Sequence, residues 1–184
     1  MRLISKFKLP KIIGHRGVKD LSPENSIESI SKAFDLGLDC VEIDVKISKD
    51  CIPLLIHDDT LDRTTTGSGL VCKFTFDEIS NLDAGYFFYK SKTQIRVPSL
   101  RQVLNELTNK KKSANIELKP NKGLEELNVI KIVNDIKDFS LENIFFSSFD
   151  LESCITLKKK LPDALCGFLN HDFSQINLND TIDI

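Results

Sequence analysis

The chain has 184 residues, of which 41% are hydrophobic and 28% are charged, and its formal net charge is −2. These values predict one soluble domain with a sizeable core, and they exclude a protein whose overall charge draws it to nucleic acid or anionic membranes. No stretch approaches the roughly 18 apolar residues of a membrane span, and residues 1–10 lack the apolar run of a signal peptide. We therefore expect a cytoplasmic protein.

The five cysteines are odd in number, and no pair has the C-x-x-C spacing of zinc or redox sites. Cys40, Cys154 and Cys166 lie inside apolar patterns, which predicts small buried side chains for these three residues. We expect no disulfides, which agrees with a reducing compartment.

The first third of the chain alternates apolar runs with a helical pattern. Residues 11–14 form a short predicted strand. A helix is predicted over residues 23–36, with Ser22 as its N-cap and a proline at its first position. The next strand covers residues 39–47, and a tight turn leads to a returning hairpin strand over residues 52–57.

The segment from residue 58 to residue 98 is irregular apart from a short helical pattern over residues 74–82, and a loop-rich stretch of this length is usually functional. Regularity returns at Ser99 and Gln102, which form a capping box at the start of a helix. Strands and helices then alternate up to a polar, weakly patterned tail. The strands are predicted at residues 115–118, 144–149 and 164–169, and the helices at residues 129–136 and 150–161.

Strands that alternate with helices of this length predict an α/β fold with a parallel sheet of βα units. The pattern alone leaves open whether the sheet is a barrel or is doubly wound. No G-x-G-x-x-G or P-loop pattern follows any strand, which removes the main signal for a nucleotide-binding α/β fold.

The stretch from Val41 to Val45 carries two acidic residues with a spacing of two. Side chains alternate between the faces of a strand, so Glu42 and Asp44 share one face and the apolar residues share the other. Two carboxylates at close range repel each other, and burying them unpaired is costly. A divalent cation removes both problems, and oxygen ligands suit Mg²⁺ or Ca²⁺. An exposed polar sheet face is the alternative explanation.

Glu117 and Lys119 repeat this arrangement on the next predicted strand of the sheet, opposite Ile116 and Leu118. Glu117 could supply a third carboxylate to the same cation. Lys119 could neutralise the site or hold a substrate oxygen, although a surface Glu–Lys pair would give the same pattern.

Two histidines lie at predicted strand ends, where βα barrels build their active sites. His15 and Arg16 end the first strand, and His57 ends the hairpin strand. A histidine can transfer protons near neutral pH, and an arginine can grip a phosphate in bidentate fashion. The whole set suits hydrolysis of a phosphodiester, with a cation polarising the phosphoryl oxygens and the two histidines acting as acid and base.

Together these residues resemble the glycerophosphodiester phosphodiesterase family. The resemblance runs from about residue 11 to about residue 169, and its motifs are highly specific because several of them occur in order. They are Gly14-His15-Arg16-Gly17, Pro23-Glu24-Asn25-Ser26, Glu42-Ile43-Asp44-Val45, His57-Asp58, Leu61-Asp62-Arg63-Thr64-Thr65 with Gly67 and Gly69, Val97-Pro98-Ser99-Leu100, Asn115-Ile116-Glu117-Leu118-Lys119 and Ser147-Ser148-Phe149.

The resemblance implies a fold of the (β/α)8 TIM-barrel type and the hydrolysis of glycerophosphodiesters to an alcohol and glycerol 3-phosphate. It implies that one divalent cation, Mg²⁺ or Ca²⁺, is bound by Glu42, Asp44 and Glu117. It also implies that the general acid and base are His15 and His57.

Two further positions and one segment also match the family pattern. Arg16 matches a phosphate-binding position, and Lys119 matches a residue near the metal site. We interpret residues 1–184 as a single, incomplete domain of this family. Residues 58–98 then correspond to the family's insertion, which shapes the substrate pocket.

The chain departs from the family pattern at three points. Ser26 stands where threonine is usual, and Cys51 stands where a turn glycine is usual, which strains the hairpin if φ is positive there. The larger departure is length, because a complete barrel takes about 250 residues. Only five of its strands can be placed, and the tryptophan-containing segment of the later strands is missing.

Three hypotheses therefore stay open at this stage. The first is an active phosphodiesterase, as this chain or once complemented by a C-terminal segment or an oligomer. The second is an inactive, truncated remnant, and the third is a related phospholipase-type phosphodiesterase. Arg63-Thr64-Thr65 favours the glycerophosphodiester class over the third.

Overall fold

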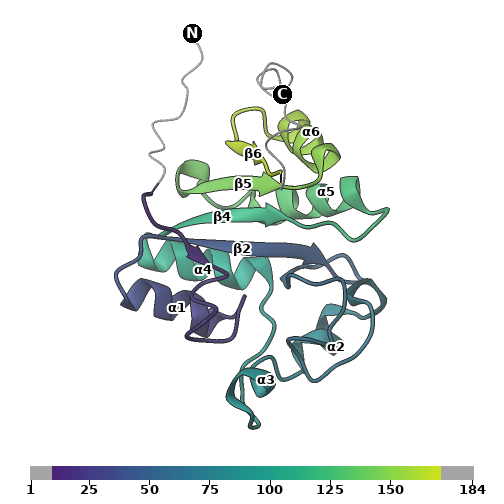
Figure 1. Ribbon diagram of the computed structural model, residues 1–184. Coiled ribbons are helices and arrows are strands. Elements are labelled where there is room, and N and C mark those ends of the chain that lie inside the picture. Colours follow the sequence, from purple (N-terminus) through teal and green to yellow (C-terminus); the bar gives the residue numbers. More distant parts are fainter. Residues whose placement is uncertain (1–9, 171–184) are drawn as a thin grey trace.

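The computed structural model describes residues 10–170. They form one β-sheet with helices packed on one of its faces (Figure 1). Five strands are parallel, in the order β1-β2-β4-β5-β6, and β3 pairs antiparallel with β2. This is an α/β fold of the TIM-barrel type, as predicted. The strands are β1 (Gly14–His15), β2 (Cys40–Ile47), β3 (Pro53–Leu55), β4 (Ser113–Leu118), β5 (Ile144–Ser148) and β6 (Cys166–Phe168).

The core lies between this sheet and four helices. The apolar side chains of β2, such as Val41, Ile43 and Val45, are fully buried against residues of these helices, and Ile116 of β4 joins them. Because side chains alternate along a strand, Glu42 and the other polar residues face the opposite side of the sheet. The helices are α1 (Ile27–Asp35), α4 (Leu100–Lys110), α5 (Glu125–Ile136) and α6 (Leu151–Lys160).

Most predicted elements occur in the structure with small shifts of their ends. The capping box of α4 is present, because Gln102 N–H donates to the Ser99 hydroxyl and the Gln102 side chain accepts from Ser99 N–H. The hairpin strand is confirmed but is shorter than predicted. Residues 1–9 and 171–184, which include the predicted tail and nearly all of the segment judged to lack a signal peptide, lie outside the described residues.

The predicted start of the first helix is wrong. The helix begins after Ser26, whose hydroxyl accepts from Ser29 N–H, and Ser22 does not cap it. The proline at position 23 suits a first helical turn, but Asn25 takes a left-handed conformation with φ 55°. Residues 23–25 therefore form a loop, and the side chain of Asn25 reaches Asp44 of β2.

The cysteine prediction holds for two of its three residues. Cys40 and Cys154 are buried, whereas Cys166 is only half-buried because β6 is an edge strand of the described sheet. No helix among residues 10–170 combines the length and the apolar character needed to cross a bilayer.

Residues 58–98 fold around a second, smaller apolar cluster that includes Leu61, Val71 and Ile79. The predicted helix over 74–82 is shorter, and it forms α2 (Phe76–Ser80) with a capping box between Thr75 and Glu78. Two further elements, η1 (Val71–Lys73) and α3 (Tyr86–Tyr89), were not predicted. Figure 1 shows α3 at the tip of this segment, away from the sheet.

Cys51→Gly is expected to raise the free energy of unfolding by up to about 1 kcal/mol. Cys51 has φ 62°, a conformation that glycine reaches without steric cost. Urea denaturation measures the change, with Cys72→Gly as the matched control, because Cys72 is also half-buried but lies in η1 without a positive φ. The control is expected to lose stability, and an equal change in both variants would contradict strain at Cys51.

Candidate metal and phosphate site

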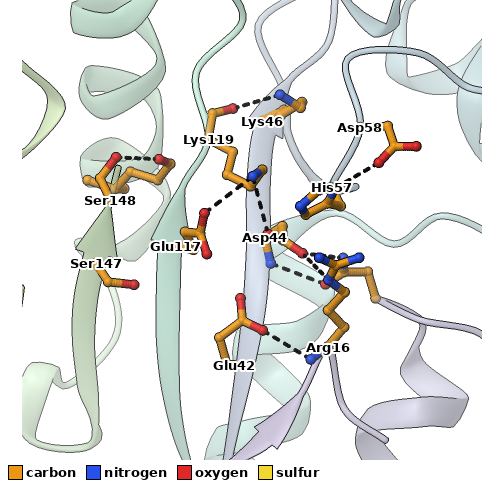
Figure 2. A network of polar contacts seen from close by, with 12 residues as sticks. Arg16, Glu42, Asp44, Lys46, His57, Asp58, Glu117, Lys119, Ser147 and Ser148 are labelled. Atoms are coloured by element: carbon orange, nitrogen blue, oxygen red, sulfur yellow. Dashed lines mark hydrogen bonds and ion pairs between the residues drawn. The ribbon is translucent and has the colours of Figure 1, made fainter. Parts of the chain in front are cut away.

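Three carboxylates meet on the polar face of the sheet (Figure 2). The register of β2 and β4 places Asp44 opposite Glu117, and Glu42 lies two residues before Asp44 on the same face. Ligand oxygens of all three residues lie within 4.8 Å of one another. Asp44 is 1% exposed and Glu117 is 9% exposed, so the cluster is largely removed from water.

The surroundings of Glu42 do not compensate a negative charge on its carboxyl group. Burial and the neighbouring Asp44 carboxylate raise its pKa to about 8. Its Oε2 accepts from Arg16 N–H at 3.1 Å, but its buried Oε1 has no hydrogen-bond partner among the described residues. A bound cation would supply that missing partner, and the all-oxygen donor set suits Mg²⁺ or Ca²⁺.

Two lysines border the carboxylates at the carboxyl ends of the strands. Lys119 Nζ lies 3.3 Å from Glu117 Oε1 and 4.0 Å from Asp44 Oδ1. The ammonium group of Lys46 is buried, donating to Asp59 at 2.7 Å and to the backbone carbonyl of Lys119 at 3.3 Å. Lys46 therefore ties the loop after His57 to the end of β4.

Asp44 is held from the other side by the first two loops. Asn25 Nδ2 donates to Asp44 Oδ2 at 2.8 Å, and Asp44 N–H donates to Asn25 Oδ1 at 3.1 Å. Arg16 Nε forms an ion pair with Asp44 Oδ2 at 3.1 Å, although its N–H is not aimed for a hydrogen bond. Arg16 Nη1 also donates to Glu24 at 2.8 Å.

Arg63 links these loops to the second histidine. Its guanidinium binds both oxygens of Asp58, at 2.6 and 2.8 Å, and both oxygens of Glu24, at 2.8 Å each. Arg63 thereby holds the pKa of Asp58 well below its usual range. Because Asp58 is ionised, it accepts the Nδ1–H of His57 at 2.7 Å, which leaves Nε2 of a neutral His57 ring as the acceptor.

The second candidate histidine, His15, is more exposed. Its Nε2 lies 3.8 Å from Glu42 Oε2, and its side chain is 54% exposed. Burial, Lys19 and Arg16 lower its pKa, so the ring is neutral near pH 7.

A hollow of about 570 Å³ opens at the carboxyl ends of the strands, where βα folds place their sites. His57, Glu117 and Lys119 line it together with Lys46 and Ser148. Wall residues thus include a carboxylate of the acidic cluster, two ammonium groups and a histidine.

The structure brings the sequence-predicted residues into one region. Glu42, Asp44 and Glu117 form the acidic cluster, Arg16 and Lys119 contact it, and His15 and His57 flank it. Four residues with no role assigned from the sequence also take part, and they are Glu24, Asn25, Lys46 and Arg63. Glu24, Asn25 and Arg63 lie inside the family motifs. The motifs therefore indicated their importance, but the sequence did not predict which residues they contact.

A parallel sheet with helices on one face and an acidic cluster on the other defines an α/β protein with a candidate cation site. Residues 15–176 match the model of the glycerophosphoryl diester phosphodiesterase family, which covers most of the chain. The chain belongs to this family.

Individual relatives agree with this assignment. The glycerophosphodiester phosphodiesterase of Caldanaerobacter subterraneus subsp. tengcongensis is 38% identical over 163 residues, which are 86% of this chain and 65% of that protein. A phosphodiesterase from Oleispira antarctica, solved in complex with the product sn-glycerol-3-phosphate, is 35% identical with a TM-score of 0.81, over 87% of this chain and 66% of that one. The chain therefore spans about two thirds of the length of these relatives.

In the cation-free protein, a rise in pH from about 5 to 8 is expected to reduce stability through Glu42. The folded chain keeps a proton on Glu42 up to a pKa of about 8, whereas the unfolded chain loses it near the ordinary value of 4.5, so stability falls across this window. Urea denaturation with a chelator at both pH values measures the slope. In Glu42→Gln, the loss of unfolding free energy between about pH 5 and pH 8 should be smaller by more than about 1 kcal/mol, because one pKa unit corresponds to about 1.4 kcal/mol.

Glu152→Gln, on an exposed position of α6, is the control and should leave the slope unchanged. Millimolar Mg²⁺ or Ca²⁺ at pH 8 should raise the melting temperature of the wild type much more than that of Glu42→Gln. Identical slopes in wild type and Glu42→Gln would contradict the raised pKa.

Proposed function

We propose that the chain carries out metal-dependent hydrolysis of glycerophosphodiesters to an alcohol and glycerol 3-phosphate. The observation that carries the proposal is the buried acidic cluster, with an unpartnered oxygen on Glu42, next to two histidines and two cationic side chains. The family match and the product named for the Oleispira antarctica relative support the choice of substrate.

Glu42, Asp44 and Glu117 would hold one divalent cation, Mg²⁺ or Ca²⁺. When bound, such a cation polarises a phosphoryl oxygen and offsets negative charge at phosphorus. Arg16, beside Asp44, and Lys119, beside Glu117, are proposed to bind the remaining phosphate oxygens, because each already lies against the acidic cluster.

His57 and His15 are proposed to move the protons. Asp58 fixes the His57 ring through Nδ1, so Nε2 is available to take a proton from the attacking hydroxyl or to return one to the leaving oxygen. The lowered pKa of His15 keeps that ring neutral and able to accept a proton near pH 7. Which histidine starts the reaction depends on which side of phosphorus each one faces.

The chain spans about two thirds of the length of its relatives. That a protein of this length is active is therefore part of the proposal. Closure of the sheet beyond the described strands, by a further segment or a second chain, is part of this proposal. We place the reaction in the cytoplasm on the basis of the sequence alone.

Purified 184-residue protein is expected to release glycerol 3-phosphate from glycerophosphocholine in the presence of Mg²⁺ or Ca²⁺, and to stop when a chelator is added. His15→Ala and His57→Ala should each lower kcat by at least about a hundredfold. His171→Ala is the matched control, because the proposal gives the third histidine no role. A coupled assay for glycerol 3-phosphate measures the rates.

The outcomes separate the hypotheses. Full activity after thorough chelation would rule out the cation, and full activity of His57→Ala would remove that residue from proton transfer. No activity from a protein that melts cooperatively would favour the inactive remnant.

Arg63 is proposed as a positioning residue. Arg63→Lys keeps the charge but cannot bind Asp58 and Glu24 in bidentate fashion, so His57 loses its fixed orientation. We expect kcat to fall roughly tenfold to a hundredfold while KM changes by less than about threefold. Arg96→Lys is the matched control, since Arg96 lies in the same segment and donates hydrogen bonds to residues 93–95.

A purely structural role for Arg63 would lower the melting temperature and leave kcat of the folded fraction unchanged. The pH profile of kcat provides the second readout. It should shift in Arg63→Lys, because Asp58 no longer stays paired with His57, and an unshifted profile would contradict the positioning role.

A further inference from the structure

The tip of the 58–98 segment exposes four consecutive aromatic side chains. Tyr86 is 41% exposed, Phe87 52%, Phe88 41% and Tyr89 48%, and no residue of α3 is buried. Lys90, Ser91 and Lys92 follow and are also exposed. We call residues 86–92 the aromatic knob. Contiguous exposed apolar side chains often mark an interaction surface, whereas single exposed ones need no explanation.

The base of the knob is closed by a specific set of hydrogen bonds. The Asp83 carboxylate accepts from Gly85 N–H and from both the N–H and the hydroxyl of Thr93, and Ala84 N–H donates to the Ile95 carbonyl. A Cβ at position 85 would lie 2.5 Å from Thr93 Oγ1, so only glycine fits this closure. The knob is therefore a built feature of the segment, and its rings point outward from a fixed base.

The rings of the knob pack on one another in two pairs. Tyr86 and Phe87 form an edge-to-face pair with centroids 5.4 Å apart, and Phe88 and Tyr89 form another at 4.9 Å. The hydroxyls of the two tyrosines give the cluster polar ends. Amphipathic aromatic side chains of this kind favour the boundary between lipid headgroups and acyl chains.

The charge of the knob is opposite to that of the whole protein. Residues 86–92 contain Lys90 and Lys92 and no acidic residue, whereas the chain as a whole has a net charge of −2. Lysines next to exposed aromatic rings complement an anionic phospholipid surface, where each contributes about 1 kcal/mol of attraction. A bilayer with anionic headgroups offers an apolar interior and a negative surface together, which fits rings and lysines placed side by side.

The knob also borders the candidate site. Phe87 and Phe88 line a hollow of about 130 Å³ together with Glu24 and Arg63, the ion pair that joins the loops of the two histidines. A surface bound by the knob would thus lie close to the Glu24–Arg63 ion pair.

We propose that the aromatic knob docks the protein on an anionic phospholipid bilayer, with the Phe87 and Phe88 rings entering the interface and Lys90 and Lys92 contacting the headgroups. This is a reversible surface contact that needs no membrane-spanning helix. It adds a binding surface that the hydrolysis itself does not require.

The amino-acid composition provides a direct probe. The chain has no tryptophan, and both of its tyrosines lie in the knob, so its intrinsic tyrosine fluorescence reports on this surface alone. The full chain is titrated with vesicles of phosphatidylcholine containing about one third phosphatidylglycerol, with bromine-labelled acyl chains as quenchers. We expect saturable quenching that weakens as salt rises and that is at least tenfold weaker with phosphatidylcholine alone.

Two variants test the two halves of the proposal, and each keeps both tyrosines. Phe87→Ser/Phe88→Ser and Lys90→Gln/Lys92→Gln should each weaken vesicle binding at least tenfold. Lys159→Gln/Lys160→Gln on the exposed end of α6 and Leu36→Ser, at a position 58% exposed, are the matched controls and should bind within about twofold of the wild type. Circular dichroism checks that all variants keep the fold.

Three results would overturn the proposal. The first is that vesicles do not quench the tyrosine emission, and the second is that both knob variants still bind vesicles. The third is that the protein does not bind vesicles but self-associates, and that Phe87→Ser/Phe88→Ser abolishes this self-association. The last would make the knob a contact between copies of this chain. None of these measurements involves catalysis, so their failure leaves the proposed hydrolysis untouched.

Discussion

The pairing of β2 with β4 is the constraint on which the rest of the site depends. It sets Asp44 beside Glu117 on the face of the sheet that the helices do not cover. The same alternation buries Val45 against Leu118 in the core, so the apolar packing and the acidic cluster are two faces of one register. A shift by one residue would place the carboxylates in the core. The packing energy of the core therefore holds the three carboxyl groups together.

Much of the surrounding structure compensates for those charges. Arg16 and Asn25 both adopt left-handed backbone conformations, with φ 51° and 55°, which cost free energy in residues other than glycine. In return, Arg16 N–H reaches Glu42, and Asn25 binds Asp44 twice. Lys119, which directly follows β4, approaches Glu117 of that same strand. Strained backbone that places hydrogen-bond donors on buried anions is typical of a binding site.

The sequence predicted the elements that depend on local signals. The parallel sheet followed from the alternation of strands and helices, and α4 followed from the capping box at Ser99. The start of α1 was missed because its proline and serine signals compete with bonds from Asn25 to Asp44, a residue far along the chain. Arg63 was missed as a link for the same reason, since it joins Glu24 to Asp58 across the fold. The short α3 was not predicted, and it buries none of its four aromatic residues.

Two features of the described chain that reduce its stability share a boundary. The acidic cluster leaves Glu42 Oε1 without a partner, and the knob leaves four aromatic side chains about half exposed. A fold shaped by packing alone would remove both, because each costs free energy that nothing in the folded chain returns. Arg63 and Glu24 lie between them, bonded to the loops of the site and lining the hollow under Phe87 and Phe88. The two costs are therefore best explained together, as the binding site for a charged ligand and the surface that brings the protein to it.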